Sequence, residues 1–466
     1  MVFYVLSSIK FKYTNVVSFY KRNILILSII LLFWLFSYLG PESKLTDGFS
    51  NAIRSDGLGY FSWTQFFMGN DTLCFDKMRK EFEIYSPQNS WVIKPIENSK
   101  CFLPIYPMGL GILLIPFYVL ASLITYLFIS APVNPYSLAF QVLISMSGSV
   151  FIAIGLIFFT KTINRFFETP LRKYSQIIAI LMLLGSNLLH YSTYDGIFSH
   201  ASSFMINSII IYSYLCIEKE KNASALYYFL LGFLPIFGTV IRPTNITMAI
   251  FSILIIHQLI KKKNITETIY FMFGLIIALQ FLLYQFYLWN KSTGNYLYFT
   301  YYSYEGFKLQ PELILQIIFS FNPHGLLPWS PILLLSLLGA VKAFRFSKNL
   351  FLSSVVIFML NTLIFSSWSQ PFGGGAFGNR LFIDLYPLFF ISLACVYTFS
   401  NRFFKSSTYV YSVMSCILTL YLTYLYWKGQ IDFGGLPFKE YVNKVQSLPQ
   451  FLAIYEMPTL FNKIFF

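Results

Sequence analysis

Charge is what this sequence has least of. Asp, Glu, Lys and Arg make up 11% of its 466 residues, against roughly 25% in soluble domains. Hydrophobic residues make up 56%, and apolar runs of about 20 residues recur, which is the length that crosses a hydrocarbon core of about 30 Å. These runs are uniformly apolar, which excludes barrel strands, because their side chains alternate. We therefore predict an all-α polytopic membrane protein.

Acidic residues are scarcer than basic ones, with 19 Asp and Glu against 33 Lys and Arg, and the net charge is +14. In a soluble protein this excess would suggest a nucleic-acid partner. Here the basic residues fall in short loops between apolar runs, which is the positive-inside pattern. We therefore expect the lipid bilayer as the partner, and no nucleic acid. The loops expected in the cytoplasm carry Lys161, Arg165, Arg172 and Lys173; Lys219 and Lys221; Lys261, Lys262 and Lys263; Lys342, Arg345 and Lys348; and Arg402 and Lys405.

Cysteine is also rare, with five in the chain. Cys216, Cys395 and Cys416 lie in or at the ends of apolar runs, where we expect them to be packing residues. Cys74 and Cys101 fall in one predicted outside loop. A disulfide between them and two free thiols are equally favoured by the sequence.

The first apolar run, residues 23–39, has no small-residue cleavage pattern of a signal peptide. Because Lys21 and Arg22 precede it, we expect a retained span with its N-terminus inside. We find no repeat of solenoid length and no repeat between the two halves of the chain.

If every basic loop lies in the cytoplasm, one apolar run cannot be a membrane crossing. If residues 106–129 crossed, the loop with Lys161 would lie outside, against the positive-inside rule. Pro and Gly interrupt this run, so we predict a bent juxtamembrane helix at the outer leaflet; a plain crossing with an irregular partner elsewhere is the alternative. The other runs predict about eleven transmembrane helices, at about 23–39, 136–160, 174–192, 201–217, 225–241, 244–260, 267–288, 326–343, 349–367, 381–400 and 408–427.

This topology makes residues 1–427 one membrane-embedded domain, followed by an outside tail at 428–466. The domain contains a large outside loop at 40–105 and the juxtamembrane segment at 106–129. The inside loops are short and merely basic, so we expect function on the outside face. The polar segments predicted there are 40–105, 194–200, 242–245, 289–310 and 366–380.

The stretch 54–60, Arg-Ser-Asp-Gly-Leu-Gly-Tyr, is the first candidate site. A charge such as Asp56 near a membrane is costly unless it is solvated, paired or functional. Gly57 and Gly59 would let a ligand approach the backbone closely, and Tyr60 follows as an interfacial aromatic. A site carboxylate and a helix N-cap are equally favoured for Asp56.

Two further outside segments carry ionisable groups. Asp195 and His200 stand about one and a half helical turns apart, where they could act on a proton or bind a metal; the spacing favours no metal. Arg242, in Ile-Arg-Pro-Thr-Asn, lies outside against the positive-inside bias. This favours phosphate binding over a snorkelling arginine. No cofactor is required by these residues, and a divalent metal is left open.

Segment 370–384, Gln-Pro-Phe-Gly-Gly-Gly-Ala-Phe-Gly-Asn-Arg-Leu-Phe-Ile-Asp, is the richest motif. Its glycine N–H groups could approach an anion, with Arg380 as a second cation. No Gly-Lys-Ser/Thr follows, so this is not a Walker loop and ATP use is not implied. Asp384 lies one turn after Arg380, close enough for an internal ion pair. His324, in Asn-Pro-His-Gly, is favoured as structural, with a sugar or phosphate ligand as the alternative.

In their order along most of the chain, these elements resemble the GT-C superfamily of membrane glycosyltransferases. The closer resemblance is to its protein-O-mannosyltransferase and aminoarabinose-transferase branch, in bacterial form. Two features differ: relatives carry an Asp-Glu pair where Gly57 follows Asp56, and the segment after Trp427 is short. The matching elements are Asp-x-x-x-Tyr at 56–60, Tyr-Pro-x-Gly at 106–109, Ser-His at 199–200, Arg-Pro-Thr-Asn at 242–245 and Phe-Gly-Asn-Arg…Asp at 377–384.

The resemblance implies an inverting transfer of a sugar from a polyprenyl-phosphate donor to a periplasmic glycan, lipid or protein, at the bacterial inner (cytoplasmic) membrane. It implies Asp56 as the catalytic base, with Asp195 orienting sugar or acceptor. Arg242 and Arg380 would bind the donor phosphate. The alternative function is a polyprenyl-lipid transporter or flippase, which should show internal repeats and charges along a path. The other residues assigned to substrate binding are Arg54, Tyr60, Tyr106, His200, His324 and Asn379.

Overall fold

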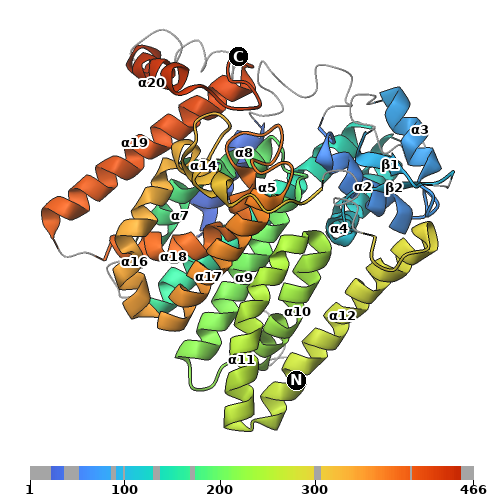
Figure 1. Ribbon diagram of the computed structural model, residues 1–466, viewed down its shortest axis with the longest axis horizontal. Coiled ribbons are helices and arrows are strands. Elements are labelled where there is room, and N and C mark those ends of the chain that lie inside the picture. The colour runs from blue at the N-terminus through green and yellow to red at the C-terminus, as the bar shows by residue number, and fades with distance from the viewer. Residues whose placement is uncertain are drawn as a thin grey trace, which may run out of the picture.

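The described chain is mostly helical, as the sequence predicts. A computed structural model describes residues 23–35, 52–85, 91–97, 100–129, 137–167, 174–298, 306–398 and 401–452. Within them the only sheet is an antiparallel pair, β1 (Ile93–Pro95) and β2 (Phe102–Pro104). The helices are arranged as one bundle with a smaller group around α2, α3 and the strands at one side (Figure 1). This confirms the all-α fold class.

The order of the other elements follows the predicted runs. They are α2 (Asp56–Phe67), α3 (Asp76–Tyr85), α4 (Gly109–Ile124), η2 (Thr125–Ile129), α5 (Leu138–Phe166), α7 (Ser175–Leu184), α8 (Leu188–Thr193), α9 (Ser199–Lys219), α10 (Ala225–Ile241), η3 (Pro243–Met248), α11 (Ala249–Lys262), α12 (Ile265–Thr293), η4 (Pro311–Leu313), α14 (Ile314–Phe319), α15 (Leu326–Trp329), η5 (Pro331–Leu333), α16 (Leu334–Phe346), α17 (Lys348–Ser367), η6 (Arg380–Leu385), α18 (Tyr386–Val396), α19 (Arg402–Trp427) and α20 (Phe438–Leu452).

Seven helices of the described chain are long and apolar enough to cross a membrane. Six of them coincide with predicted spans, and the seventh is Gly109–Phe128. Three predicted spans contain shorter apolar helices, at Asn23–Leu35, Ser175–Leu184 and Ala225–Ile241. The runs at 326–343 and 381–400 are each divided, because a proline begins a new helical segment at Pro331 and another lies in the first turn at Pro387. The predicted membrane character is therefore confirmed, and the number of crossings stays a prediction.

Within the segment at 106–129, residues Gly109–Ile129 form one continuous helical run of α4 and η2. It runs through Pro116. Its glycines serve close packing: a Cβ on Gly109 would lie 2.6 Å from the carbonyl carbon of Val240, and one on Gly111 would lie 2.5 Å from Trp63 Cβ. By length and composition this helix can cross a membrane, which is the alternative to the predicted juxtamembrane placement.

Several of the basic loops that the structure describes gather at one end of the bundle. Arg165 forms an ion pair with Glu220, and Lys219 donates a hydrogen bond to the carbonyl of Phe346. The α9–α10 and α11–α12 turns both lie at the bottom of Figure 1. Since α10 starts beside this cluster and ends at Ile241, residue Arg242 marks the opposite end.

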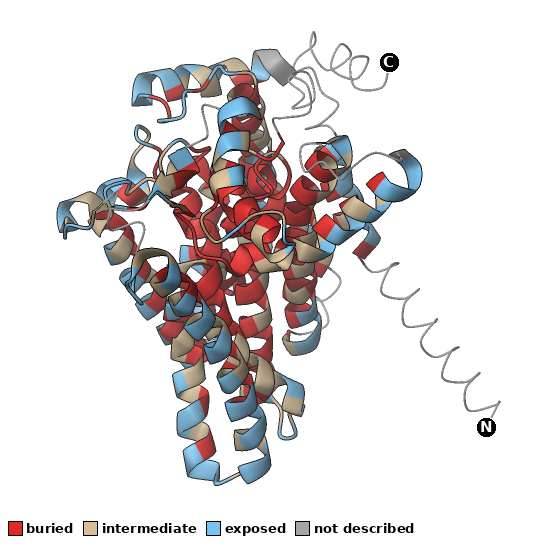
Figure 2. Ribbon diagram, turned by 90° about the vertical axis from the view of Figure 1, so that its right-hand side faces the viewer, coloured by how far each residue is buried: buried red, intermediate tan, exposed pale blue. Residues whose placement is uncertain are grey.

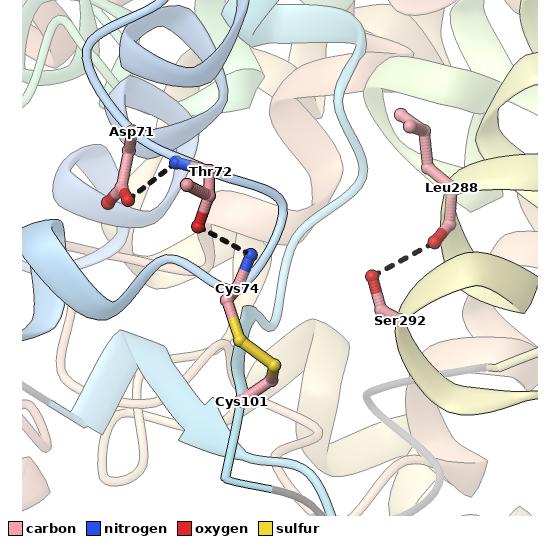
Figure 3. Close-up of a disulfide and its surroundings, with 6 residues drawn as sticks. All are labelled: Asp71, Thr72, Cys74, Cys101, Leu288 and Ser292. Carbon is pink, nitrogen blue, oxygen red and sulfur yellow. Dashed lines mark hydrogen bonds between the residues drawn. A yellow bond between two sulfur atoms is a disulfide. The ribbon is translucent and has the colours of Figure 1, made fainter.

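A disulfide between Cys74 and Cys101 fastens the segment that carries Asp56 (Figure 3). The Phe102 N–H also donates to the Cys74 carbonyl at 2.9 Å. Asp71 accepts hydrogen bonds from the N–H groups of Thr72 and Met78, each at 2.7 Å. The disulfide alternative of the sequence is thus confirmed, and α2 is held against the β1–β2 pair.

The buried core is concentrated near the middle of the bundle and toward the end opposite the basic loops (Figure 2). The most buried of the candidate spans is Ser199–Lys219, in which 89% of the most apolar stretch is buried inside the protein. Residues at the start of α9 therefore lie in the interior, where charged or polar side chains need partners.

Candidate functional site

A cavity of about 920 Å³ opens at the end of the bundle opposite the basic loops. Segments far apart in sequence form its wall: the start of α2, the turn before α9, the start of η3, the glycine-rich loop and the end of α19. Its ionisable lining residues include Arg54, Asp56, Asp195, Arg242, Arg380 and Lys428. Seven of the ten residues assigned from the sequence line it: Arg54, Asp56, Tyr60, Tyr106, Asp195, Arg242 and Arg380.

Asp56 is the first residue of α2, and its carboxylate faces Arg380. Asp56 Oδ2 lies 3.0 Å from Arg380 Nη1, and both side chains are almost fully buried. Ser55 Oγ donates to Asp56 Oδ1 at 3.3 Å. Ser55 has φ 47° and ψ −133°, a backbone conformation that is uncommon for a residue with a side chain. The chain therefore turns sharply just where it presents this carboxylate to the cavity.

The glycines beside Asp56 have a different role from the predicted one. A Cβ on Gly57 would lie 2.1 Å from Ile197 Cγ2, and one on Gly59 would lie 2.6 Å from Tyr106 Cδ2. The close neighbours are thus the protein's own side chains, which pack α2 against the turn before α9 and against Tyr106.

Arg242 and Asp384 form a second buried pair. Arg242 Nε lies 2.7 Å from Asp384 Oδ2, and the carboxyl side chain is 3% exposed. His200 Nδ1 lies 3.2 Å from Asp384 Oδ1. The internal Arg380–Asp384 pair expected from their spacing is therefore replaced by two longer-range pairs, because η6 is a 3-10 helix that turns these side chains to different partners.

Arg54 and His190 both hold Asp195. Arg54 Nη2 lies 3.2 Å from its Oδ1, and His190 Nε2 lies 2.9 Å from its Oδ2. The Arg54 guanidinium also stacks 4.5 Å above the centre of the Tyr194 ring. Asp195 thus presents a fixed carboxylate at the cavity wall.

Tyr60 and Tyr106 make an aromatic wall beside these charges. Their rings stack with centroids 4.5 Å apart, and Tyr60 donates to Ser199 Oγ at 2.8 Å. Burial raises the pKa of Tyr60 to about 12, although the charge of Arg242 opposes this. Tyr60 therefore stays protonated near neutral pH and acts as a hydrogen-bond donor.

Arg54 and Arg380 remain cations in the cavity wall. Burial alone would lower the pKa of Arg54 and of Arg380, but the carboxylates of Asp195 and Asp56 outweigh this, so both pKa values lie above the ordinary one. Each guanidinium is thus a permanent positive charge with a carboxylate within hydrogen-bond distance, which suits it to exchange one anion for another.

The glycine-rich loop lies against the stem of Arg380. Gly373 has φ +84° and Gly374 has φ +67°, a region that L side chains rarely adopt. A Cβ on Gly373 would lie 3.0 Å from Arg380 Cγ and 3.3 Å from its Nε, whereas nothing lies within 4 Å of a Cβ on Gly374. The loop therefore sets the position of the arginine that pairs with Asp56.

These two glycines allow a matched test. Gly373→Ala and Gly374→Ala each place an alanine at positive φ and should each cost about 1–2 kcal/mol of stability. Only Gly373→Ala should also displace Arg380, and so weaken anion binding by about tenfold beyond the Gly374→Ala control. Equal losses in the two variants, measured as thermal midpoints and anion affinities, would show that the loop does not position Arg380.

Three residues assigned from the sequence lie behind the wall. His200 is 2% exposed, and Arg242 Nη1 lies 3.2 Å from its Nε2. Asn379 caps η6 by accepting the Leu381 N–H at 3.2 Å. His324 Nε2 lies 2.9 Å from the carbonyl of Phe372. They support the arginines and the glycine-rich loop from outside the cavity lining.

His324 predicts a pH dependence of stability. Burial lowers its pKa to about 4, whereas the unfolded chain would have the ordinary value of about 6.5. Between these values the unfolded state binds more protons, so stability falls as pH falls, by up to about 3 kcal/mol. Thermal unfolding in detergent between neutral and acidic pH should show this slope, and His324→Gln should flatten it. An unchanged slope in the variant would exclude His324 as its source.

The sequence reasoning missed the contribution of the last long helix. Tyr426, Trp427, Lys428 and Gly429, at the end of α19, line the cavity together with Phe433. A Trp-Lys pair at a span end is also the ordinary signature of a membrane interface, so it carried no separate signal. His190 was missed as well, because it lies inside a predicted span.

No group of three or more His, Cys, Asp or Glu that could hold a metal ion occurs among the described residues. The three arginines that line the cavity are each paired with a carboxylate: Arg54 with Asp195, Arg242 with Asp384 and Arg380 with Asp56. These guanidinium groups can bind an anion through charge-assisted hydrogen bonds.

Comparison with family models, with curated proteins and with solved structures gives no match.

Proposed function

We propose that this protein is a glycosyltransferase of the GT-C type, which moves a sugar from a polyprenyl-phosphate donor to an acceptor hydroxyl with inversion. The observation that carries the proposal is the convergence of Asp56, Arg380 and Arg242 on one cavity at one end of an apolar helix bundle. A carboxylate and two guanidinium groups are what a base and a phosphate site need.

The donor phosphate would bind between Arg242 and Arg380. Both guanidinium groups line the cavity and are held by carboxylates, Asp384 at 2.7 Å and Asp56 at 3.0 Å. An arginine binds phosphate oxygens with directed N–H groups. As the bond between the anomeric carbon and the phosphate oxygen breaks, its electron pair moves to that oxygen, and the two cations stabilise the new charge.

Asp56 would act as the base. The acceptor oxygen attacks the anomeric carbon from the face opposite the leaving phosphate, and its proton passes to the Asp56 carboxylate. Binding of the donor phosphate to Arg380 would weaken the Asp56–Arg380 pair and free the carboxylate for this proton. Asp195, held by Arg54 and His190, would orient the sugar or the acceptor.

The aromatic lining suits a sugar. Tyr60 and Tyr106 form one stacked wall, and Tyr194, Trp427 and other rings line the remainder. Aromatic faces accept the apolar face of a pyranose, while hydroxyl and charged groups bind its polar edge. The donor lipid would reach this cavity sideways from the outer leaflet of a bacterial inner membrane, with the cavity facing the periplasm.

Mass spectrometry of envelope glycans and glycolipids, with and without the gene, tests the proposal and names the product. The expected result is a glycan or glycolipid that loses one sugar when the gene is deleted. Purified protein should release polyprenyl phosphate from a polyprenyl-phosphate sugar only when the acceptor is added. Lipid scrambling without any sugar transfer would overturn the proposal and favour the flippase alternative.

A further inference from the structure

His190, in α8, is a fully buried imidazole directly behind the cavity wall. It is 0% exposed. Trp427 Nε1 donates to its Nδ1 at 2.9 Å, and its Nε2 lies 2.9 Å from Asp195 Oδ2. Both ring nitrogens are therefore engaged, one by α19 and one by the residue that presents a carboxylate to the cavity.

The chemistry of these partners fixes the tautomer of His190. An indole N–H only donates hydrogen bonds, so Nδ1 must accept and carries no proton. The single proton of the neutral ring then lies on Nε2 and is donated to Asp195. A second proton on Nδ1 would place two N–H groups against each other in the protein interior and break the bond to Trp427.

A series of contacts leads from Asp195 back to Trp427, the residue that donates a hydrogen bond to His190. Arg54 binds the other oxygen of Asp195 at 3.2 Å and stacks 4.5 Å above the Tyr194 ring. The Tyr194 ring in turn stacks on Trp427, with centroids 5.3 Å apart and planes 19° apart. The contacts thus form a ring through Arg54, Asp195, His190, Trp427 and Tyr194, which we call the His190 network. All of these residues except His190 line the cavity.

We propose that His190 is a positioning residue: held neutral by Trp427, it fixes the Asp195 carboxylate and through it Arg54, so that the cavity wall keeps one protonation state as the medium acidifies. This rests on the proposed transferase function and adds to it a residue that touches neither donor nor acceptor. The free Nδ1 of a histidine without such a donor would gain a proton on the acid side of neutrality.

The groups around the ring agree with this role. The titratable side chains that face it include Asp195, at hydrogen-bond distance, and the rings of Tyr191, Tyr194 and Tyr426, with centroids at 4.8, 5.3 and 5.3 Å. The nearest cation in the network is Arg54, which lies behind Asp195. Phe377, from the glycine-rich segment, packs on the ring at 5.5 Å.

Trp427→Phe tests the proposal because it removes the N–H donor and keeps a ring to stack on Tyr194. Because Trp427 also lines the cavity, each variant is compared with its own rate at mildly alkaline pH. On that scale we expect transfer by Trp427→Phe to fall about tenfold more than wild-type transfer toward pH 5.5, where Nδ1 gains a proton. Adding His190→Gln to the Trp427→Phe variant supplies Asp195 with a hydrogen-bond donor that cannot titrate. The extra loss of activity toward pH 5.5 should then disappear. An equal loss at every pH in Trp427→Phe would show a packing role alone and overturn the proposal.

Trp329→Phe is the matched control. It also removes a buried indole N–H, one that donates to the Phe321 carbonyl at 3.2 Å, and its pH profile should keep the wild-type shape. An acid limb in this control as well would show a general effect of losing a buried indole N–H and overturn the proposal.

A spectroscopic measurement separates this inference from the proposed function. Ultraviolet resonance Raman spectra report whether an indole N–H is hydrogen-bonded, and they need no substrate. The wild-type minus Trp427→Phe difference should show a bonded indole, and His190→Leu should convert that signal to an unbonded one. A signal unchanged by His190→Leu would overturn the positioning role even in an active enzyme. Absence of transfer with this signal intact would overturn only the transferase proposal.

Discussion

Asp56→Asn is expected to abolish sugar transfer while tightening the binding of the lipid phosphate. The amide has nearly the shape of the carboxylate, but it cannot take the acceptor proton, and loss of a positioned base costs about 10²–10⁴ in rate. The substitution also removes the anion that pairs with Arg380 at 3.0 Å. With that competitor gone, polyprenyl phosphate should bind several-fold more tightly, measured by equilibrium titration of the purified protein.

The opposite signs of these two effects make the test specific. A variant that was merely misfolded would lose transfer and binding together. Asp71→Asn provides the control, since Asp71 lies on the same segment and binds the N–H groups of Thr72 and Met78. It should leave transfer nearly unchanged. Full activity of Asp56→Asn would remove Asp56 from the mechanism.

Arg242→Gln is expected to have the largest effect on stability. It leaves the Asp384 carboxyl, which is 3% exposed, without the guanidinium that compensates it. Breaking a buried ion pair by removing one partner costs about 3–5 kcal/mol. Thermal unfolding in detergent should therefore show a large fall in the midpoint, together with loss of phosphate binding.

A second substitution separates the two roles of Arg242. Arg242→Gln with Asp384→Asn removes both charges and allows an amide–amide hydrogen bond in their place, so most of the stability should return. Phosphate binding should stay weak, because the cation is still missing. Recovery of phosphate affinity in the double variant would show that Arg242 serves the fold alone.

Much of this molecule could be predicted from apolar runs and basic loops. The apolar runs located the helices, because backbone N–H and C=O groups must be hydrogen-bonded within the chain to cross hydrocarbon. The basic loops indicated which helix ends lie together. The breaks near Pro331 and Pro387 were harder to place, since a proline is tolerated in the first turn of a helix and excluded from its interior. The course of residues 106–129 relative to a bilayer depends on neighbours that the run itself does not encode.

The members of the site could be listed in advance, but their pairing could not. Asp56, Arg242 and Arg380 stood out because a charge beside an apolar run needs a reason. Which acid meets which arginine depends on contacts between segments more than a hundred residues apart, and the local rule of one helical turn chose the wrong partner for Arg380. His190 and Trp427 gave no signal, because an aromatic or imidazole side chain at a span end has an ordinary explanation.

The described basic loops and the cavity lie at opposite ends of one bundle. Any reaction in the cavity would therefore take place on one side of the membrane only. Insertion alone would decide which compartment supplies the acceptor, and no later rearrangement of the protein is needed to choose. In vesicles that hold the protein in both orientations, a membrane-impermeant acceptor would reach only the molecules whose cavity faces the bulk solution. Detergent would then give the acceptor access to the molecules whose cavity faces the vesicle interior, and the measured activity would rise.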